Sequence, residues 1–171
     1  MITEKIKFSP EFVKQDAASY CFAEVETENL TPARIWRNLC NISVWNRFNP
    51  DVVDIQPLDP GDNDPHLFDK MQFNYDLASG QHVAAQVIFC QSPKDDRPGR
   101  LAYQGTVVAD NKDVNEFIVE VIVGVPDHTS HVTVQAAMSA KNDITYADKN
   151  LYTDALQTFL YNLAKWSERH D

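Results

Sequence analysis

Hydrophobic and polar residues alternate along most of this chain, whereas the last segment has a helical spacing. Alternation with a period of two is typical of strands that bury one face. The pattern predicts strands over residues 16–27, 52–58, 66–77, 81–91, 100–108, 113–124 and 130–140. Turn-forming Gly, Pro, Asn and Asp residues separate the later strands. Such short hairpin links predict an antiparallel sheet.

Residues 145–171 predict one long amphipathic helix, which Thr145 and Asp148 could open as a capping box. Apolar side chains recur on one stripe of this helix, at Tyr152, Ala155, Leu156, Phe159, Leu160, Leu163 and Ala164. We expect Asp154, Lys165 and Glu168 to stay in water. A stripe this broad needs a concave partner, and the sheet is the only candidate in the chain.

Short helices are predicted between the first and second strands. Thr31 and Pro32 have the chemistry of an N-cap followed by a first helical residue, so we expect a helix over 33–40. Another helical piece over 42–48 should stop before Asn49-Pro50. We expect the tryptophans of these pieces to anchor them rather than to contact a ligand.

The order of elements predicts an α+β fold. It is a strand, two short helices, six strands and a long helix, which implies a curved antiparallel sheet of about seven strands around the C-terminal helix. The length of 171 residues suits a single domain over 1–171. Residues 1–15 are mixed in character and form an N-terminal arm to which the pattern assigns no structure.

The composition of the chain argues against several classes of binding partner. The net charge of −10 argues against nucleic acid and against anionic membrane surfaces, since both require a basic footprint. No apolar stretch approaches the roughly 18 residues of a membrane-spanning helix, so no integral membrane association is expected. The first residues lack the apolar centre of a signal peptide, which predicts a cytoplasmic protein. The odd, widely spaced set of Cys21, Cys40 and Cys90 forms neither a disulfide framework nor a CxxC motif.

Several segments, in this order, resemble the START-like superfamily, also called SRPBCC, which has the helix-grip fold and includes polyketide cyclases and lipid-transfer domains. They are TPARIWRNL at 31–39, WNRFNPDVVDI at 45–55, RLAY at 100–103 and the terminal helix at 151–166. A cone-shaped fold of the nuclear-transport-factor type begins with its helices and ends on sheet, and a lipocalin barrel lacks the helices after the first strand. The resemblance implies a cavity between the sheet and the final helix, entered near the short helices and the strand loops.

The alternation identifies side chains that would line such a cavity. The candidate ligand-binding residues are Asp69, Met71, Phe73, Tyr75, Phe89, Tyr103, Phe117, Tyr152, Leu156, Phe159 and Leu163. The same inward faces would also fill a solid core. The resemblance favours a pocket, as do the small residues Ala85, Gly105 and Ala136 on faces that must oppose a helix. Its expected volume is a few hundred cubic ångströms.

Asp69 is the candidate catalytic residue. Alternation places it on the same face as Met71 and Phe73, and an inward carboxylate is costly to bury unless it is paired. It could orient the polar end of a ligand or act as a base with a raised pKa. Alternatively, a strand edge or bulge leaves Asp69 in water. The Tyr75 and Tyr103 hydroxyls could meet a ligand or could bond to backbone in the core.

Catalytic motifs are scarce. The five histidines show no HxxxH or HExxH spacing, and there is no GxSxG and no glycine-rich phosphate loop, so neither a metal nor a cofactor is expected. Three hypotheses follow: a non-catalytic carrier or sensor of a small hydrophobic or aromatic molecule, such as a lipid or polyketide-like metabolite; a cyclase or dehydratase that uses the same cavity; and an interaction protein like the chaperone activators that share the fold. The scarcity of motifs favours the carrier. Ligand identity and oligomeric state are left open.

Overall fold

The structure is a computed structural model that describes residues 20–58, 65–109, 112–141 and 146–170. The first part of the chain contains β1 (Tyr20–Thr27), α1 (Pro32–Cys40), a 3₁₀ turn η1 (Ile42–Val44) and α2 (Trp45–Phe48). The sheet continues through β2 (Val52–Pro57), β3 (Gln72–Leu77), β4 (His82–Gln91), β5 (Gly99–Ala109), β6 (Lys112–Val123) and β7 (Val132–Ala140). Helix α3 (Tyr146–Arg169) ends the fold.

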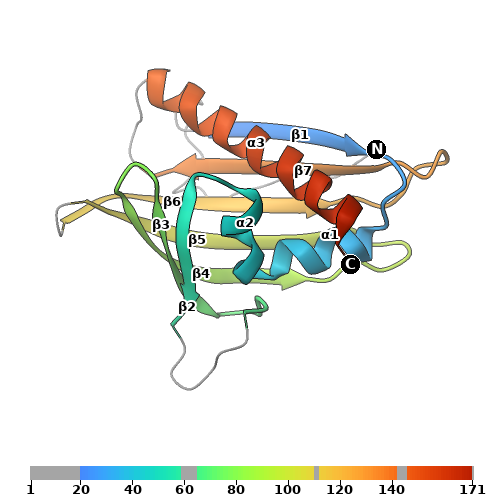
Figure 1. The fold of residues 1–171 in the computed structure, drawn as a ribbon, viewed down its shortest axis with the longest axis horizontal. Coiled ribbons are helices and arrows are strands. Elements are labelled where there is room, and N and C mark those ends of the chain that lie inside the picture. The colour runs from blue at the N-terminus through green and yellow to red at the C-terminus, as the bar shows by residue number, and fades with distance from the viewer. Residues whose placement is uncertain (1–19, 59–64, 110–111, 142–145, 171) are drawn as a thin grey trace.

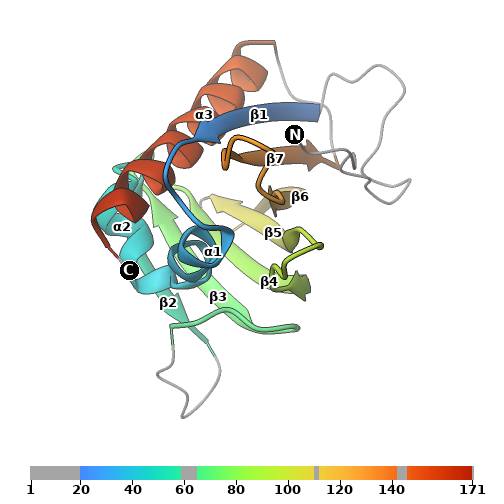
Figure 2. The same ribbon diagram turned by 90° about the vertical axis from the view of Figure 1, so that its right-hand side faces the viewer.

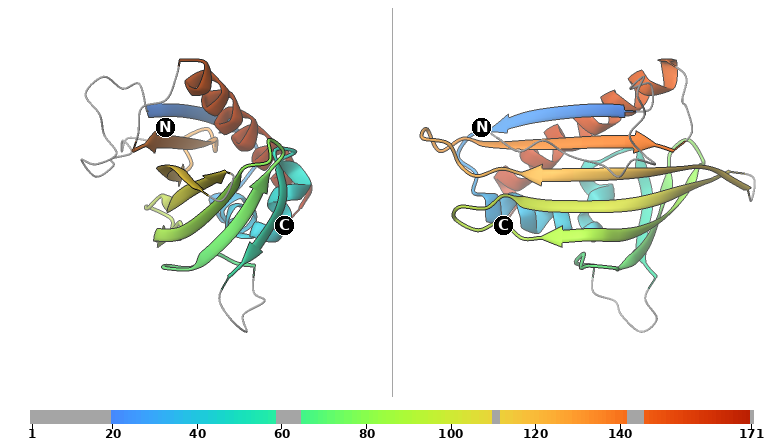
Figure 3. Two further views of the ribbon diagram at one scale, coloured as in Figure 1. Left: turned by 90° about the vertical axis from the view of Figure 1, so that its left-hand side faces the viewer. Right: turned by 180° about the vertical axis from the view of Figure 1, so that it is seen from behind.

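All described strands form one antiparallel sheet in the order β1-β7-β6-β5-β4-β3-β2. Helix α3 crosses one face of this sheet diagonally, and α1 and α2 lie on the same side (Figures 1 and 2). From behind, the strands lie in front of all the helices (Figure 3). The predicted α+β, helix-grip-like architecture is therefore confirmed. No helix within the described ranges is long and apolar enough to cross a membrane.

Helix α1 starts and is anchored as its sequence indicates. The Thr31 hydroxyl accepts a hydrogen bond from the Arg34 amide at 3.2 Å, and Pro32 occupies the first turn, where an N–H is not needed. The Asn38 amide group donates to the Ser167 hydroxyl at 3.2 Å and to the His170 carbonyl at 3.0 Å. These bonds hold α1 against the C-terminal end of α3.

The apolar stripe of α3 faces the sheet as predicted. Leu160 and Leu163 are fully buried, while Asp154, Lys165 and Glu168 are exposed. The other stripe residues are partly or almost wholly buried, at Tyr152, Ala155, Leu156, Phe159 and Ala164. The expected Thr145 capping box and the 1–15 arm lie outside the described residues.

The third predicted strand is the main error in the predicted elements. It was expected from residue 66 but begins at Gln72, because the segment before it pairs elsewhere. The Leu67 amide donates to the Cys40 carbonyl at 2.7 Å, and the Ile42 amide donates to the Pro65 carbonyl at 3.0 Å. These bonds tie residues 65–67 to the connection between α1 and η1, whereas Lys70 and Met71 bond to Val87 of β4.

The inward orientation is wrong for both Asp69 and Phe89, and for Asp69 the alternative, a carboxylate left in water, holds. Asp69 lies exposed in the turn before β3, next to Lys70, which has a positive φ of 70°. Phe89 follows a shift of register between β4 and β5 after Val87, and its side chain is 45% exposed. A bulge adds a residue to one strand and so reverses the alternation beyond it.

Candidate ligand cavity

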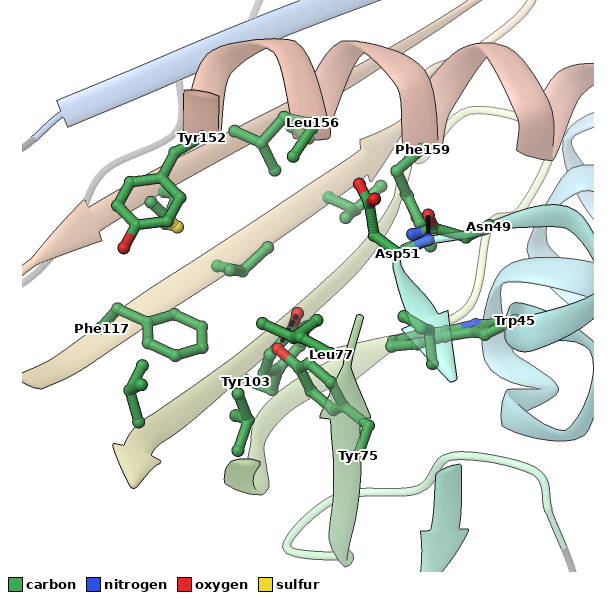
Figure 4. Close-up of a pocket in the computed structure, with 18 of the residues that line it drawn as sticks. Trp45, Asn49, Asp51, Tyr75, Leu77, Tyr103, Phe117, Tyr152, Leu156 and Phe159 are labelled. Atoms are coloured by element: carbon green, nitrogen blue, oxygen red, sulfur yellow. Dashed lines mark hydrogen bonds between the residues drawn. The ribbon is translucent and has the colours of Figure 1, made fainter. Parts of the chain in front are cut away.

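A cavity of about 170 Å³ lies between α3 and the concave face of the sheet. It is smaller than the few hundred cubic ångströms expected from the sequence. Figure 4 shows Tyr152, Leu156 and Phe159 descending from α3, with Tyr103 and Phe117 on the strands beneath and Trp45 at the end nearest the short helices. The helix thus forms the roof of the cavity and the sheet forms its floor.

Both surfaces follow from simple periodicities. Tyr152, Ala155, Leu156 and Phe159 line the roof, and their spacing of three and four residues places them on one helical face. The floor comes from alternate residues of the central strands, since every second side chain of a strand points to the same face. These floor residues are Tyr75, Leu77, Val83, Leu101, Tyr103, Val107, Phe117, Val119, Val121, Ala136, Met138 and Ala140.

Trp45 closes one end of the cavity. Its indole N–H donates to the Leu39 carbonyl at 2.9 Å, and its ring centroid lies 5.9 Å from that of Phe73 and 5.3 Å from that of Phe159. Trp45 anchors α2, as the sequence predicts, and it also lines the cavity. A tryptophan in a helix too short to bury it alone was the available signal.

Gly105 gives Phe117 its position on the floor. The two residues are directly paired between β5 and β6, and a Cβ added to Gly105 would lie 2.6 Å from Cζ of Phe117. The phenyl ring therefore rests on the glycine backbone. A larger residue at this position would push the ring off the strand.

Part of the cavity lining is exposed and includes several polar residues. Asp51 is exposed, and Leu77, Gln81, Asn115 and Tyr152 are partly exposed, whereas Tyr75, Tyr103 and Phe117 are buried. Asp51 is the one charged residue among the described lining residues. Asp51, Asn49 and Val52 were not predicted to line the cavity, because nothing in the spacing of the turn and strand after α2 indicates that they meet the roof.

The polar group deep inside is a pair of tyrosine hydroxyls. The Tyr75 and Tyr103 oxygens lie 3.4 Å apart, and each residue is only 8% exposed. Burial raises the pKa of Tyr103 to about 12, and burial also raises the pKa of Tyr75 well above its ordinary value. Both hydroxyls therefore stay protonated at neutral pH and can act as hydrogen-bond donors.

The structure places the predicted ligand-binding residues in three environments. Those that line the cavity are Tyr75, Tyr103, Phe117, Tyr152, Leu156 and Phe159. Met71, Phe73 and Leu163 are buried in the surrounding core and do not line it. Asp69 and Phe89 are exposed and away from it, for the reasons given above. The catalytic candidate Asp69 therefore does not meet the other candidates.

Titratable groups also gather outside the cavity. Glu26, Asp127 and His131 each place one possible metal-ligand atom within 4.8 Å of the others. Asp127 already has a local role, because its Oδ1 accepts hydrogen bonds from the Thr129 hydroxyl at 2.7 Å and from the His131 amide at 2.9 Å. These bonds lower the pKa of Asp127 to about 2. They explain this carboxylate as the organiser of the β6–β7 turn.

Comparison with known proteins shows the fold alone. No family model and no curated protein matches the chain. A hypothetical protein of Helicobacter pylori superposes with a TM-score of 0.83 at 19% identity, over 98% of each chain. A protein of Nitrosospira multiformis has a TM-score of 0.61 at 11% identity, over 85% of this chain and 94% of that one.

DynU16, a protein in the dynemicin biosynthetic locus, has the same arrangement. Its TM-score is 0.63 at 10% identity, and the match covers 88% of this chain but 48% of DynU16. The present chain thus spans about half the length of DynU16. These superpositions show that several proteins share the helix-grip-like fold of this chain. Membership of the START-like superfamily stays a prediction.

Proposed function

We propose that this protein is a START-like carrier or sensor that binds a small hydrophobic or aromatic molecule in the cavity under α3. The observation that carries the proposal is an apolar space where helix and sheet could have packed solidly. Tyr152, Leu156 and Phe159 are on the apolar stripe of α3, yet they are only partly buried and face this space. Concave, mostly apolar sites with few polar groups are the usual form of a small-molecule site.

The lining favours a neutral ligand. No Lys, Arg or His belongs to the described lining, so an anion inside would lack a compensating charge. Asp51 at the rim would repel an anion further. A volume of about 170 Å³ suits a compact ring system or a short chain rather than a large lipid. A small polyketide-like metabolite fits these limits, and the likeness to a protein of a biosynthetic locus is compatible with them.

The cyclase or dehydratase hypothesis has weaker support. Proton transfer is most effective when the pKa of the catalytic group lies near the working pH. The tyrosines of the described lining are Tyr75, Tyr103 and Tyr152, and burial moves their pKa values upward, away from neutrality. Asp51 is exposed at the rim. The interaction-protein hypothesis required a filled cavity, so the open one counts against it.

The ligand itself can be sought by native mass spectrometry of protein purified from its own host. We expect a co-purifying hydrophobe at one molecule per chain, released on unfolding. Titration with a fluorescent hydrophobe should likewise saturate at one site.

A pair of matched variants tests the location. Leu156→Trp places an indole in the cavity from the roof and should abolish binding, while Leu151→Trp makes the same change on a side chain of α3 that is 65% exposed. Leu151→Trp should bind like the wild type. Equal binding by both variants, or a lack of binding by the folded wild type, would contradict the proposed function.

A further inference from the structure

We propose that the hydroxyls of Tyr75 and Tyr103 hold the carbonyl oxygen of a neutral ligand, so that the natural ligand is a hydrophobe bearing a ketone, aldehyde, ester or quinone group at its buried end. This inference rests on the proposed function and specifies the ligand of the same cavity. Its basis is the hydrogen-bonding capacity of two buried side chains.

The two hydroxyls meet across a strand. Tyr75 is on β3 and Tyr103 is on β5, with β4 between them in the sheet. Tyr75 pairs with Val83 of β4, whereas Tyr103 pairs with Val87, so the two rings start from different levels and lean toward each other. Figure 4 shows both side chains at the floor of the cavity. Their oxygens converge on the space beneath α3.

Aromatic packing holds both rings in place. Phe73 lies between them, with its ring centroid 6.2 Å from that of Tyr75 and 5.4 Å from that of Tyr103. Trp45 and Phe117 also contact Tyr103, at centroid distances of 6.2 Å and 6.3 Å. The donors are therefore fixed before a ligand arrives, which lowers the entropic cost of binding.

The hydroxyl pair does not satisfy its own hydrogen bonds. Two O–H groups can donate twice, but one bond between them uses a single donor, and no other hydrogen-bond partner of either is found in the part of the chain that the structure describes. The separation of 3.4 Å exceeds the roughly 2.5–3.0 Å usual for O–H···O bonds. A buried donor without an acceptor is costly, so the site is poised to take an acceptor from a ligand.

The acceptor is a neutral carbonyl on two grounds. A carbonyl oxygen has two lone pairs and can accept from both hydroxyls at once, replacing one long bond by two short ones. A carboxylate or phenolate would carry its charge into a lining whose one charged residue is itself an acid, Asp51. Because burial keeps both tyrosines protonated, they donate and do not accept the proton of an acid.

Two probes of similar shape isolate the carbonyl. Isothermal titration should show that 1-tetralone binds the wild type about three- to tenfold more tightly than tetralin, the corresponding hydrocarbon, since one net buried hydrogen bond contributes roughly that factor. Tyr75→Phe and Tyr103→Phe should each reduce the preference, and the double variant should abolish it while tetralin still binds. Tyr161→Phe, at an exposed position of α3, is the matched control and should keep the preference.

Infrared spectroscopy of bound 1-tetralone gives a second readout that does not depend on affinity. The carbonyl stretch should move to lower frequency in the wild type than in an apolar solvent, and the shift should disappear in the double variant. Tetralin binding with no preference for the ketone and no shift would overturn this inference and leave the proposed function intact. A preference that survives in the double variant would also overturn it. Failure of both probes to bind would overturn the inference together with the proposed function.

Discussion

The two halves of helix α3 carry the same apolar stripe but meet different surroundings. Tyr152 and Leu156 in the first half are partly buried over the cavity, whereas Leu160 and Leu163 in the second half are at most 1% exposed. The second half meets α1, which the Asn38–Ser167 hydrogen bond joins to it, and its Phe159 packs on Trp45 and Phe48 of α2. The first half lies over the hollow of the sheet and beside β1, where the Gln157 side-chain amide donates to the Glu24 carbonyl at 2.9 Å.

This difference shows how one helix can be both a structural anchor and the roof of a binding site. Solid packing around the second half fixes the position of α3, so the first half need not fill the space beneath it. Periodicity alone cannot distinguish the halves, because both require the same spacing of apolar residues. The distinction depends on which element lies opposite.

The largest expected effect on stability comes from shortening one leucine side chain in each half of α3. Leu163→Ala should lower the free energy of unfolding by about 2–5 kcal/mol, because it opens a void in a packed region. Leu156→Ala should cost on the order of 1 kcal/mol, since its side chain is partly exposed to an existing space and leaves no new enclosed void. Denaturant unfolding measures both, with the exposed Leu151→Ala as control.

Binding measurements should give the reverse order. Leu156→Ala should enlarge the cavity and favour bulkier hydrophobes, while Leu163→Ala, which remains outside the lining, should keep the wild-type preference as long as it is folded. Equal losses of stability from the two truncations would mean that the halves are packed alike. The proposed division of α3 would then be wrong.

Alkaline pH should destabilise the protein because of the buried tyrosines of the cavity floor. The pKa of Tyr103 is about 12 in the folded protein against 10.0 for the free side chain, because burial disfavours the phenolate. The unfolded chain loses this proton first, so the contribution of Tyr103 to stability is complete below pH 10.0 and is lost as the pH rises toward 12. The loss should be roughly 1.4 kcal/mol per pH unit in that window.

Tyr103→Phe should flatten this part of the stability profile, measured by denaturant unfolding at a series of pH values. Tyr161→Phe, on the exposed side of α3, is the matched control. An unchanged profile in Tyr103→Phe would show that the cavity floor admits water freely. The contrast between a dry floor and a partly exposed roof would then fail.

Most of the fold could be predicted because strands and helices have distinct periods. The bounds of β4 and α3 differ from the expected 81–91 and 145–171 by two residues at most, since each segment keeps one pattern throughout. The orientations of two side chains were predicted wrongly, for local reasons that the alternation of residues does not reveal. Phe89 lies beyond a bulge, and Asp69 follows a segment that pairs with the α1–η1 connection.

The candidate site could be predicted in part. The roof residues and Tyr103 follow from periodicity once the helix is set against the sheet. Phe73 and Leu163 were also expected in the cavity, but whether an inward residue meets a space or another side chain depends on packing in three dimensions. Trp45 and Asp51 reach the cavity from segments outside the sheet and roof, which sequence spacing does not place.

Gly105→Ala tests the contribution of the sheet to the cavity. The new methyl group would lie 2.6 Å from the Phe117 ring, which must swing away from β5. We expect a loss of about 1–3 kcal/mol from overpacking, reduced if the ring moves into the cavity without strain. Hydrophobe affinity should fall in either case, because the floor changes shape.

Thr106→Ala is the control for this change, since the neighbouring side chain is outside the cavity lining. Fluorescence titration and unfolding should be measured together on both variants. An affinity unchanged in Gly105→Ala would place the bound probe away from Phe117. The floor would then contribute less to binding than the roof of α3.

The smallest effect is expected at Asp127, in the connection between β6 and β7. Asp127 organises the β6–β7 turn through its bonds to Thr129 and His131, which hold its pKa at about 2 against an ordinary 3.8. Its contribution to stability is therefore present above pH 3.8 and is lost as the pH falls toward 2. Asp127→Asn should remove this dependence of stability on pH. Carboxyl NMR of the wild type and acid unfolding of both proteins measure it.

Because the turn is outside the cavity lining, the affinity of Asp127→Asn for a hydrophobe at neutral pH should match that of the wild type. A changed affinity would mean that the turn and the cavity are coupled through β6, and that the sheet under α3 responds as one unit rather than as separate anchoring and binding regions.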